Sequence, residues 1–194
     1  MTIEYHTPIS YPVRRVGKVI FDPLFKLAYP IIRNKLKVND TIIEGLENIP
    51  KIGPVLILPK HRHYADTPVI WAVARKANRY PNYVMKSDLP SIFWYLGGIR
   101  INRVMDIKFK LEKAREGINS SKEMIRITAE AIEKNQESLN YMAYLLRKRE
   151  LIISFPEGTF YNDRVRPINP DKVLRRVIQT QKEMKEKIFI LPIG

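Results

Sequence analysis

The sequence predicts an α/β fold: a single domain in which helices flank a largely parallel mixed sheet, preceded by an amphipathic helical segment. Short apolar stretches bounded by glycine or proline alternate with longer stretches in which apolar residues recur every three or four positions. The short stretches are apolar throughout, which is typical of strands covered on both faces of a parallel sheet. The 194 residues suffice for one such core. We therefore expect an N-terminal segment over residues 1–40 and a folded domain over 41–194.

The N-terminal segment mixes basic residues with aromatic and aliphatic ones between residues 11 and 37. Pro23 and Pro30 are expected to divide this stretch into short helical pieces. Helices that lie in a membrane interface need cations for lipid phosphates and apolar side chains for the acyl boundary. The segment therefore favours attachment to a membrane surface. The alternative is a helix packed on its own domain with a solvated basic rim.

The folded domain is expected to begin with a short strand and a turn over residues 41–50. The apolar run over 53–59 predicts a buried strand. Asp66 and Pro68 predict the start of a helix, because a capping oxygen followed by proline is typical of a first turn. The elements expected next are the rest of this helix over 69–77, a strand over 82–86, and an apolar turn, a glycine pair and a short extended piece over 91–103.

A long helix is predicted after this point, because one apolar stripe recurs at spacings of three, four or seven. Lys148 and Arg149 suit its C-terminal end. The stripe consists of Ile118, Ile125, Ala129, Ile132, Leu139, Met142 and Leu146. The order is completed by a buried strand over 151–156, a helix over 171–186 and a last strand over 187–193.

The chain carries a net charge of +14 and has a pI near 9.9, which indicates an anionic partner such as an acidic lipid or a phosphorylated substrate. No long Lys/Arg tract and no nucleic-acid-binding motif accompanies this charge, so we expect no nucleic-acid partner. No apolar run reaches the ~18 residues of a membrane span. The absence of cysteine excludes disulfides, thiolate metal sites and cysteine nucleophiles, and it favours an intracellular, reducing location. Together with the N-terminal segment, this predicts a peripheral location on the cytoplasmic side of a membrane.

Two of the three histidines, His61 and His63, follow the strand predicted over 53–59 and precede Asp66. Sites in open α/β sheets form outside the carboxyl ends of strands, where this turn is expected. If the turn brings them together, Asp66 can bind one ring nitrogen of His61 and leave the other as a general base. The chain has no Gly-x-Ser-x-Gly elbow, so such a base would activate a substrate hydroxyl. The alternatives are a simple helix cap beside a turn histidine, or a metal site formed by His61, His63 and Asp66.

Two other segments are expected at the same edge of the sheet. The turn over 157–159 offers backbone N–H groups and the Thr159 hydroxyl for a phosphate oxygen, while Glu157 suits a substrate hydroxyl. Arg100 and Arg103 follow the glycine pair and are expected to point in different directions. A guanidinium suits phosphate. The alternatives are an ordinary turn and surface arginines.

Together these segments resemble the glycerolipid acyltransferase family that includes the 1-acylglycerol-3-phosphate acyltransferases, from about residue 41 to the end. The His-x-x-x-x-Asp block of that family is similar to the stretch from His61 to Asp66. Its later blocks resemble Gly98 to Arg103, the Phe-Pro-Glu-Gly-Thr run at 155–159, and the apolar strand from Ile190 to Ile193. The resemblance implies a glycerol-3-phosphate acyltransferase-like fold.

The resemblance also implies an activity. A fatty acyl group would pass from acyl-CoA or acyl-carrier protein to the free hydroxyl of a lysophospholipid, with 1-acylglycerol 3-phosphate giving phosphatidic acid as the leading reaction. His61 would be the base, and Asp66 would orient it. The residues implied to bind the acceptor are Arg103, Glu157, Gly158 and Thr159. No metal or organic cofactor is implied, and the N-terminal segment would rest on an anionic membrane surface.

The sequence departs from the family pattern at three positions. Lys60 and His63 stand where the family often has Asn and Ser, and Phe160 stands where many members have Arg. His63 is therefore a competing base. The departures leave open the same chemistry on glycerol 3-phosphate or another lysophospholipid, and also a catalytically weak lipid-binding module. Because members usually continue past the fourth block, the chain is expected to be truncated at Gly194.

Overall fold

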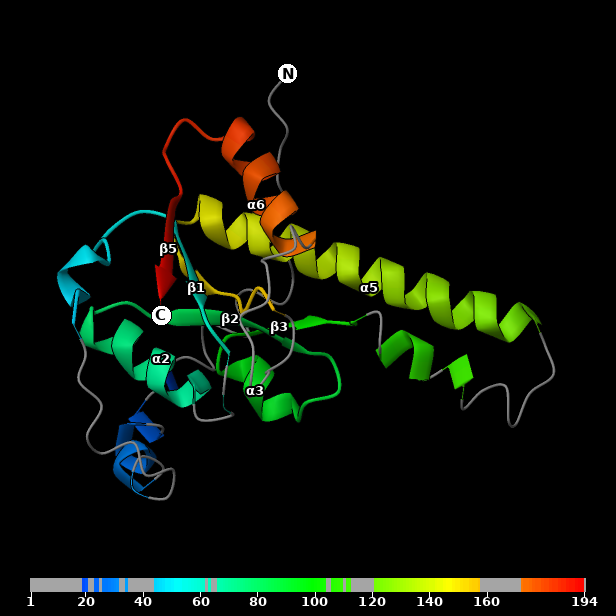
Figure 1. The fold of residues 1–194 in the computed structure, drawn as a ribbon, viewed down its shortest axis with the longest axis horizontal. Helices are drawn as coiled ribbons and strands as arrows, with labels where there is room; N and C mark the ends of the chain where they lie inside the picture. Colours follow the sequence, from blue (N-terminus) through cyan, green and yellow to red (C-terminus); the bar gives the residue numbers. More distant parts are fainter. Residues whose placement is uncertain are drawn as a thin grey trace.

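The computed structural model confirms the α/β architecture (Figure 1). It describes residues 19–20, 23–24, 26–31, 34, 44–61, 63, 66–103, 106–109, 111–112, 121–157 and 172–193. The labelled elements in chain order are η1 (Leu46–Asn48), β1 (Val55–Pro59), α2 (Asp66–Lys76), β2 (Pro81–Lys86), α3 (Ser91–Tyr95), β3 (Gly98–Ile101), α5 (Ser121–Arg147), β4 (Leu151–Ile153), α6 (Lys172–Glu183) and β5 (Phe189–Ile193). The described part of 41–50 contains the 3-10 helix η1, and residues 41–43, where a strand is expected, lie outside the described residues.

The five strands form a sheet in the order β3-β2-β4-β1-β5, and each neighbouring pair is parallel. The chain leaves β1 through α2 toward β2, whereas it leaves β4 through α6 toward β5. The connections that follow two adjacent strands therefore depart in opposite directions. This makes the carboxyl ends of β1 and β4 the switch point of the sheet, the position at which open α/β sheets bind ligands.

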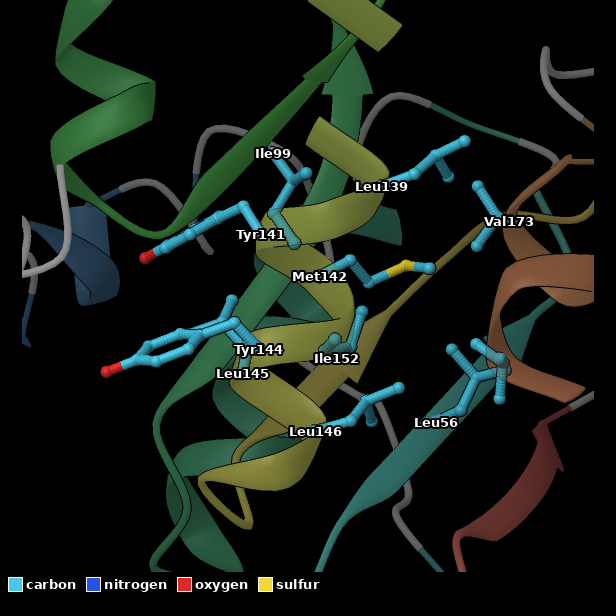
Figure 2. Packing of buried hydrophobic residues seen from close by; sticks show 11 residues of the cluster. Leu56, Ile99, Leu139, Tyr141, Met142, Tyr144, Leu145, Leu146, Ile152 and Val173 are labelled. Atoms are coloured by element: carbon cyan, nitrogen blue, oxygen red, sulfur yellow. The ribbon is translucent and has the colours of Figure 1, made fainter. Parts of the chain in front are cut away.

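The side chains of β1 alternate between two buried layers. Val55 and Ile57 pack in a cluster that includes Val73 of α2, while Leu56 packs on the opposite face with α5 and α6. Because both faces are covered, β1 and β4 are apolar at every position. The buried residues of the cluster on the α5 and α6 side are Leu56, Ile99, Leu139, Tyr141, Met142, Tyr144, Leu145, Leu146, Ile152, Val173 and Val177 (Figure 2).

Only the C-terminal part of the apolar stripe predicted for α5 is buried. Leu139, Met142 and Leu146 lie in the core, whereas Ile125 and Ile132 are 69% and 55% exposed. The physical reason is the length of the helix: its N-terminal part extends past the end of the sheet (Figure 1).

Helices α5 and α6 lie side by side and run in the same direction (Figure 1). Near the start of α6, Arg176 donates to the Asn140 side chain of α5 over 3.0 Å, and at the other end Arg147 pairs with Glu183. Asn135 of α5 bonds Asn102, which directly follows β3. The N-terminal part of α6 and the middle of α5 therefore lie at the carboxyl edge of the sheet.

The glycine pair before β3 allows this strand to lie against β2. Gly97 has φ of +101°, and a Cβ atom there would sit 2.6 Å from the Pro81 carbonyl oxygen. Any other residue would push the two segments apart. The glycines thus allow β3 to pair closely with β2, and this pairing determines where Arg103 lies after the end of β3.

The opposite, amino edge of the sheet is held by Arg79, which is only 7% exposed. Its guanidinium donates to three backbone carbonyl oxygens, those of Pro50 at 2.6 Å, Gly53 at 2.8 Å and Arg149 at 2.8 Å. Burial lowers the pKa of Arg79, although the charge of Glu150 opposes this effect. One side chain therefore connects, by hydrogen bonds, the segments that precede β1 and β4.

The described residues between 19 and 34 are helical, and Pro30 lies within the helical run 26–31 rather than ending it. Tyr29 contacts Trp71 of α2, with ring centroids 6.4 Å apart. Among the described helices, none combines the length and the hydropathy that a membrane crossing requires. The assignment of residues 1–40 to a separate membrane-associating segment stays a prediction.

Candidate active site

The His61 and Asp66 side chains meet across the turn between β1 and α2. His61 follows β1, Asp66 is the first residue of α2, and the His61 Nδ1 atom lies 3.1 Å from Asp66 Oδ2. An ionised carboxylate only accepts hydrogen bonds, so this contact places a proton on Nδ1 and leaves Nε2 as the basic nitrogen of the neutral ring. The two side chains are 17% and 25% exposed. An imidazole held in this way can take a proton from a bound hydroxyl.

The Asp66 carboxylate also fixes the turn itself. Its Oδ2 atom accepts the His63 backbone N–H at 2.8 Å, and the Asp66 N–H donates to the His63 carbonyl oxygen at 3.0 Å. Asp66 therefore holds both the backbone of this turn and the His61 ring. His63 is exposed, whereas His61 is half-buried. Of the two histidine rings, His61 has the described side-chain bond to the carboxylate.

Phe155 places the His61 ring at the switch point. This residue lies two positions after the end of β4, and its ring stacks on the His61 ring with centroids 4.2 Å apart and an interplanar angle of 29°. The contact shows that the carboxyl ends of β1 and β4 converge. Phe155 belongs to the Phe-Pro-Glu-Gly-Thr run noted in the sequence, but its contact with His61 was not predicted. The spacing of residues along the chain does not reveal that β1 and β4 are neighbours in the sheet.

Arg103 lies just past β3 and forms a two-pronged ion pair with Asp106. Its Nε and Nη2 atoms donate to the two carboxylate oxygens over 2.8 and 2.9 Å. The hydrogen bond from Arg103 lowers the pKa of Asp106, and the same bond raises the pKa of Arg103. Asp106 was not among the predicted site residues, although its spacing of three from Arg103 is a usable signal. The pair fixes the guanidinium, and a role for Arg103 in acceptor binding stays a prediction.

Lys86 extends this charged group from the end of β2. Its Nζ atom lies 2.5 Å from Asp88 and 3.6 Å from Asp106, and the hydrogen bond with Asp88 is the main reason that the pKa of Lys86 is raised. Arg100 points elsewhere, as expected, and donates to the Leu89 carbonyl oxygen and the Ser91 hydroxyl. Lys86, like Asp106, was missed, although it ends a predicted strand on the edge where the site was expected.

A buried amide network supports the residue before Arg103. The Asn135 side chain of α5 accepts the Asn102 backbone N–H at 2.7 Å and donates to the Asn102 carbonyl oxygen at 2.9 Å. Ser87 donates to the Asn102 side chain at 2.8 Å. Asn135 and Asn102 are 4% and 9% exposed, so the bonds are shielded from water. The network joins α5 to the ends of β2 and β3.

The third predicted segment is described only in part. Glu157 is half-buried in the turn after β4. Gly158 and Thr159, predicted to bind the acceptor, lie outside the described residues, as does Phe160. Over the described ranges, no three His, Cys, Asp or Glu side chains converge on a metal site.

The family model described as Acyltransferase matches residues 40–194. The matched range includes β1 to β5 and every residue of the site. The comparison with curated proteins gives no match.

Proposed function

The chain belongs to the Acyltransferase family, which includes the glycerolipid acyltransferases, and we propose that it acylates the free hydroxyl of a lysophospholipid. An acyltransferase activity, with an acyl donor and a lipid acceptor, follows from the family. The substrates are the proposal: acyl-CoA or acyl-carrier protein as donor, and 1-acylglycerol 3-phosphate as acceptor, giving phosphatidic acid.

The observation that supports this proposal is the 3.1 Å contact between His61 Nδ1 and Asp66 Oδ2 beside the switch point. It provides a base whose tautomer is fixed by a carboxylate. The sequence contains no cysteine, so a thiol-linked acyl-enzyme is ruled out, and a direct transfer between the two substrates fits the residues.

In the proposed step, His61 Nε2 takes the proton of the acceptor hydroxyl while the oxygen of that hydroxyl attacks the carbonyl carbon of the thioester. The new C–O ester bond forms and the C–S bond breaks. The departing thiolate then takes the proton from the imidazolium, which returns His61 to its starting state. Asp66 stabilises the positive charge that His61 carries between the two proton transfers.

The acceptor phosphate is assigned to Arg103 and the turn over 157–159. Asp106 holds the Arg103 guanidinium in one orientation, which lowers the entropy cost of binding a phosphate. The net charge of +14 favours an anionic acceptor at the same time.

We place the enzyme on the surface of a membrane, where its acceptor resides. Five large aliphatic residues of the described N-terminal helical stretch support this, since each is more than half exposed: Val19, Ile20, Leu24, Leu27 and Ile31. Tyr29 attaches this stretch to Trp71 of α2, the helix that begins with Asp66. A membrane surface that covers the apolar residues would thus lie on the side of the domain formed by α2.

The test is acyl transfer from labelled acyl-CoA, or from acyl-carrier protein, to a panel of lysophospholipids and glycerol 3-phosphate. We expect His61→Ala to reduce turnover by roughly 10²- to 10⁴-fold, the usual contribution of a general base. His63→Ala is the matched control on the same turn and should retain turnover within about threefold. Both variants should bind anionic vesicles as the unmodified protein does.

Three outcomes would contradict the proposal. Full turnover by the His61 variant would show that another group is the base, and loss confined to the His63 variant would identify that group. Vesicle binding without acylation of any acceptor from either donor would favour the lipid-binding module.

A further inference from the structure

The α5 and α6 helices form an open pocket on the layer of the molecule opposite to α2. Its volume is about 270 Å³. The polar residues that line it are Asn135, Gln136, Lys172, Arg175, Arg176 and Gln179, and Ile132 and Leu139 complete the wall. Three basic residues thus line this open pocket, and the described residues of its wall include no carboxylate. This composition indicates an anionic ligand.

Arg176 shows how the pocket keeps its charge. The guanidinium donates to Gln179 Oε1 and Asn140 Oδ1, each over 3.0 Å. Both acceptors are neutral amides, so these bonds orient the guanidinium without neutralising it. The Nε atom is buried and has no acceptor within the described part of the chain. An oriented, un-neutralised guanidinium is suited to phosphate oxygens.

The pocket lies at the carboxyl edge of the sheet, the edge that also carries His61. Asn135 joins it to the end of β3 through Asn102, and Lys172 begins α6, which enters from the carboxyl end of β4. A ligand that binds phosphates here can extend along the same edge toward the switch point. The pocket is nevertheless distinct from the site, because none of its lining residues belongs to the His61 turn.

We propose that this pocket binds the phosphate groups of a CoA thioester donor, an inference that rests on the proposed function. CoA carries a diphosphate and a 3′-phosphate at one end and the thioester at the other, with the pantetheine arm between them. A donor of this shape needs a cationic subsite apart from the reacting atoms. Lys172, Arg175 and Arg176 supply that subsite, and the neutral amides of Asn135 and Gln136 add hydrogen-bonding groups.

The test measures binding of CoA to the 194-residue chain by calorimetry, without turnover. Lys172→Gln combined with Arg175→Gln removes two charges from the pocket. Lys182→Gln combined with Lys185→Gln is the matched control, because it removes two charges from exposed residues at the far end of α6 and after it. We expect the pocket variant to weaken CoA binding at least about tenfold, or ~1.4 kcal/mol, and the control to stay within about twofold. Binding of pantetheine, which lacks the phosphates, should be the same in all three proteins.

The remaining outcomes would overturn the inference. Equal losses in both double variants would show a nonspecific effect of net charge. Unchanged CoA binding in the pocket variant, or no CoA binding by the unmodified protein, would exclude CoA from the pocket. If the pocket variant instead loses binding only to phosphatidylglycerol vesicles, the ligand is a lipid headgroup. If CoA binding depends on the pocket but the protein transfers no acyl group, the proposed function is refuted and the CoA site is retained. If the protein transfers acyl groups but its CoA binding does not depend on the pocket, the CoA site is refuted and the proposed function is retained.

Discussion

Replacement of Asp66 by Asn separates the two roles that the carboxylate performs. The amide retains an oxygen that can accept the His63 N–H and the His61 Nδ1–H from the position of Oδ2, at 2.8 and 3.1 Å. The turn and the start of α2 should therefore survive. What the change removes is the negative charge next to His61.

The size of the effect follows from that charge. Two unit charges about 4 Å apart near a protein surface interact by at most ~4 kcal/mol, and hydrogen bonds to charged groups typically contribute about 1.5–3 kcal/mol. Since both side chains are partly exposed to water, we expect a loss of about 2–3 kcal/mol in stabilisation of the imidazolium. This corresponds to a reduction in kcat of roughly 30- to 150-fold. The free energy of unfolding should fall by less than about 1 kcal/mol, the usual net contribution of one hydrogen bond.

The assay pairs steady-state acyl transfer with urea denaturation, on the unmodified protein and on Asp66→Asn. Asp66→Ala is the comparison variant, because it removes the acceptor as well and should lose more stability. A kcat within threefold of the unmodified value, together with a clear loss of stability, would refute the reasoning. Asp66 would then be a structural residue of the turn, and His61 would not depend on it for catalysis.

Two further predictions concern the edges of the sheet. Arg79→Met removes the donor of three backbone carbonyl oxygens, so the free energy of unfolding in urea should fall by about 3 kcal/mol, at ~1 kcal/mol for each hydrogen bond, while turnover per folded molecule is retained. A loss below about 1 kcal/mol would show that water replaces the guanidinium. Asp106→Asn tests the ion pair with Arg103, which lowers the pKa of the Asp106 carboxyl in the folded state. The pKa of Asp106 in the folded protein lies below its value of about 4 in the unfolded chain. The carboxylate therefore stabilises the fold fully at pH values above the unfolded pKa, and this contribution is lost as the pH falls through the folded pKa. Screening by solvent limits the expected difference in unfolding free energy at pH 7 to about 1 kcal/mol, and a difference that persists unchanged in acid would contradict this account.

Local patterns predicted the elements well because the forces that form them are local. The apolar run that became β1 and the helix start at Asp66 follow from burial and from turn chemistry. The meeting of His61 with Asp66 could also be anticipated, since five residues across a strand-to-helix turn bring the two side chains within reach.

The strand order could not be predicted, because strands that are apolar on both faces carry no mark of their neighbours. Contacts that depend on this order were missed for the same reason. Phe155 reaches His61 only because β4 lies beside β1. The bonds between Asn102 and Asn135 join positions 33 residues apart, with no shared pattern in the sequence.

The order of the strands also has a consequence for biosynthesis. Val55 of β1 pairs with Leu151 on one side and Phe189 on the other, whereas β2 and β3, which follow β1, pair with each other. On the ribosome, β1 emerges long before either of its partners, and its apolar surface has no strand to join. The β2 and β3 unit can assemble early, but the contact between His61 and Phe155 exists only after β4 has inserted between β2 and β1. Acyl transfer is therefore a property that the nascent chain acquires late, in a step governed by long-range contacts.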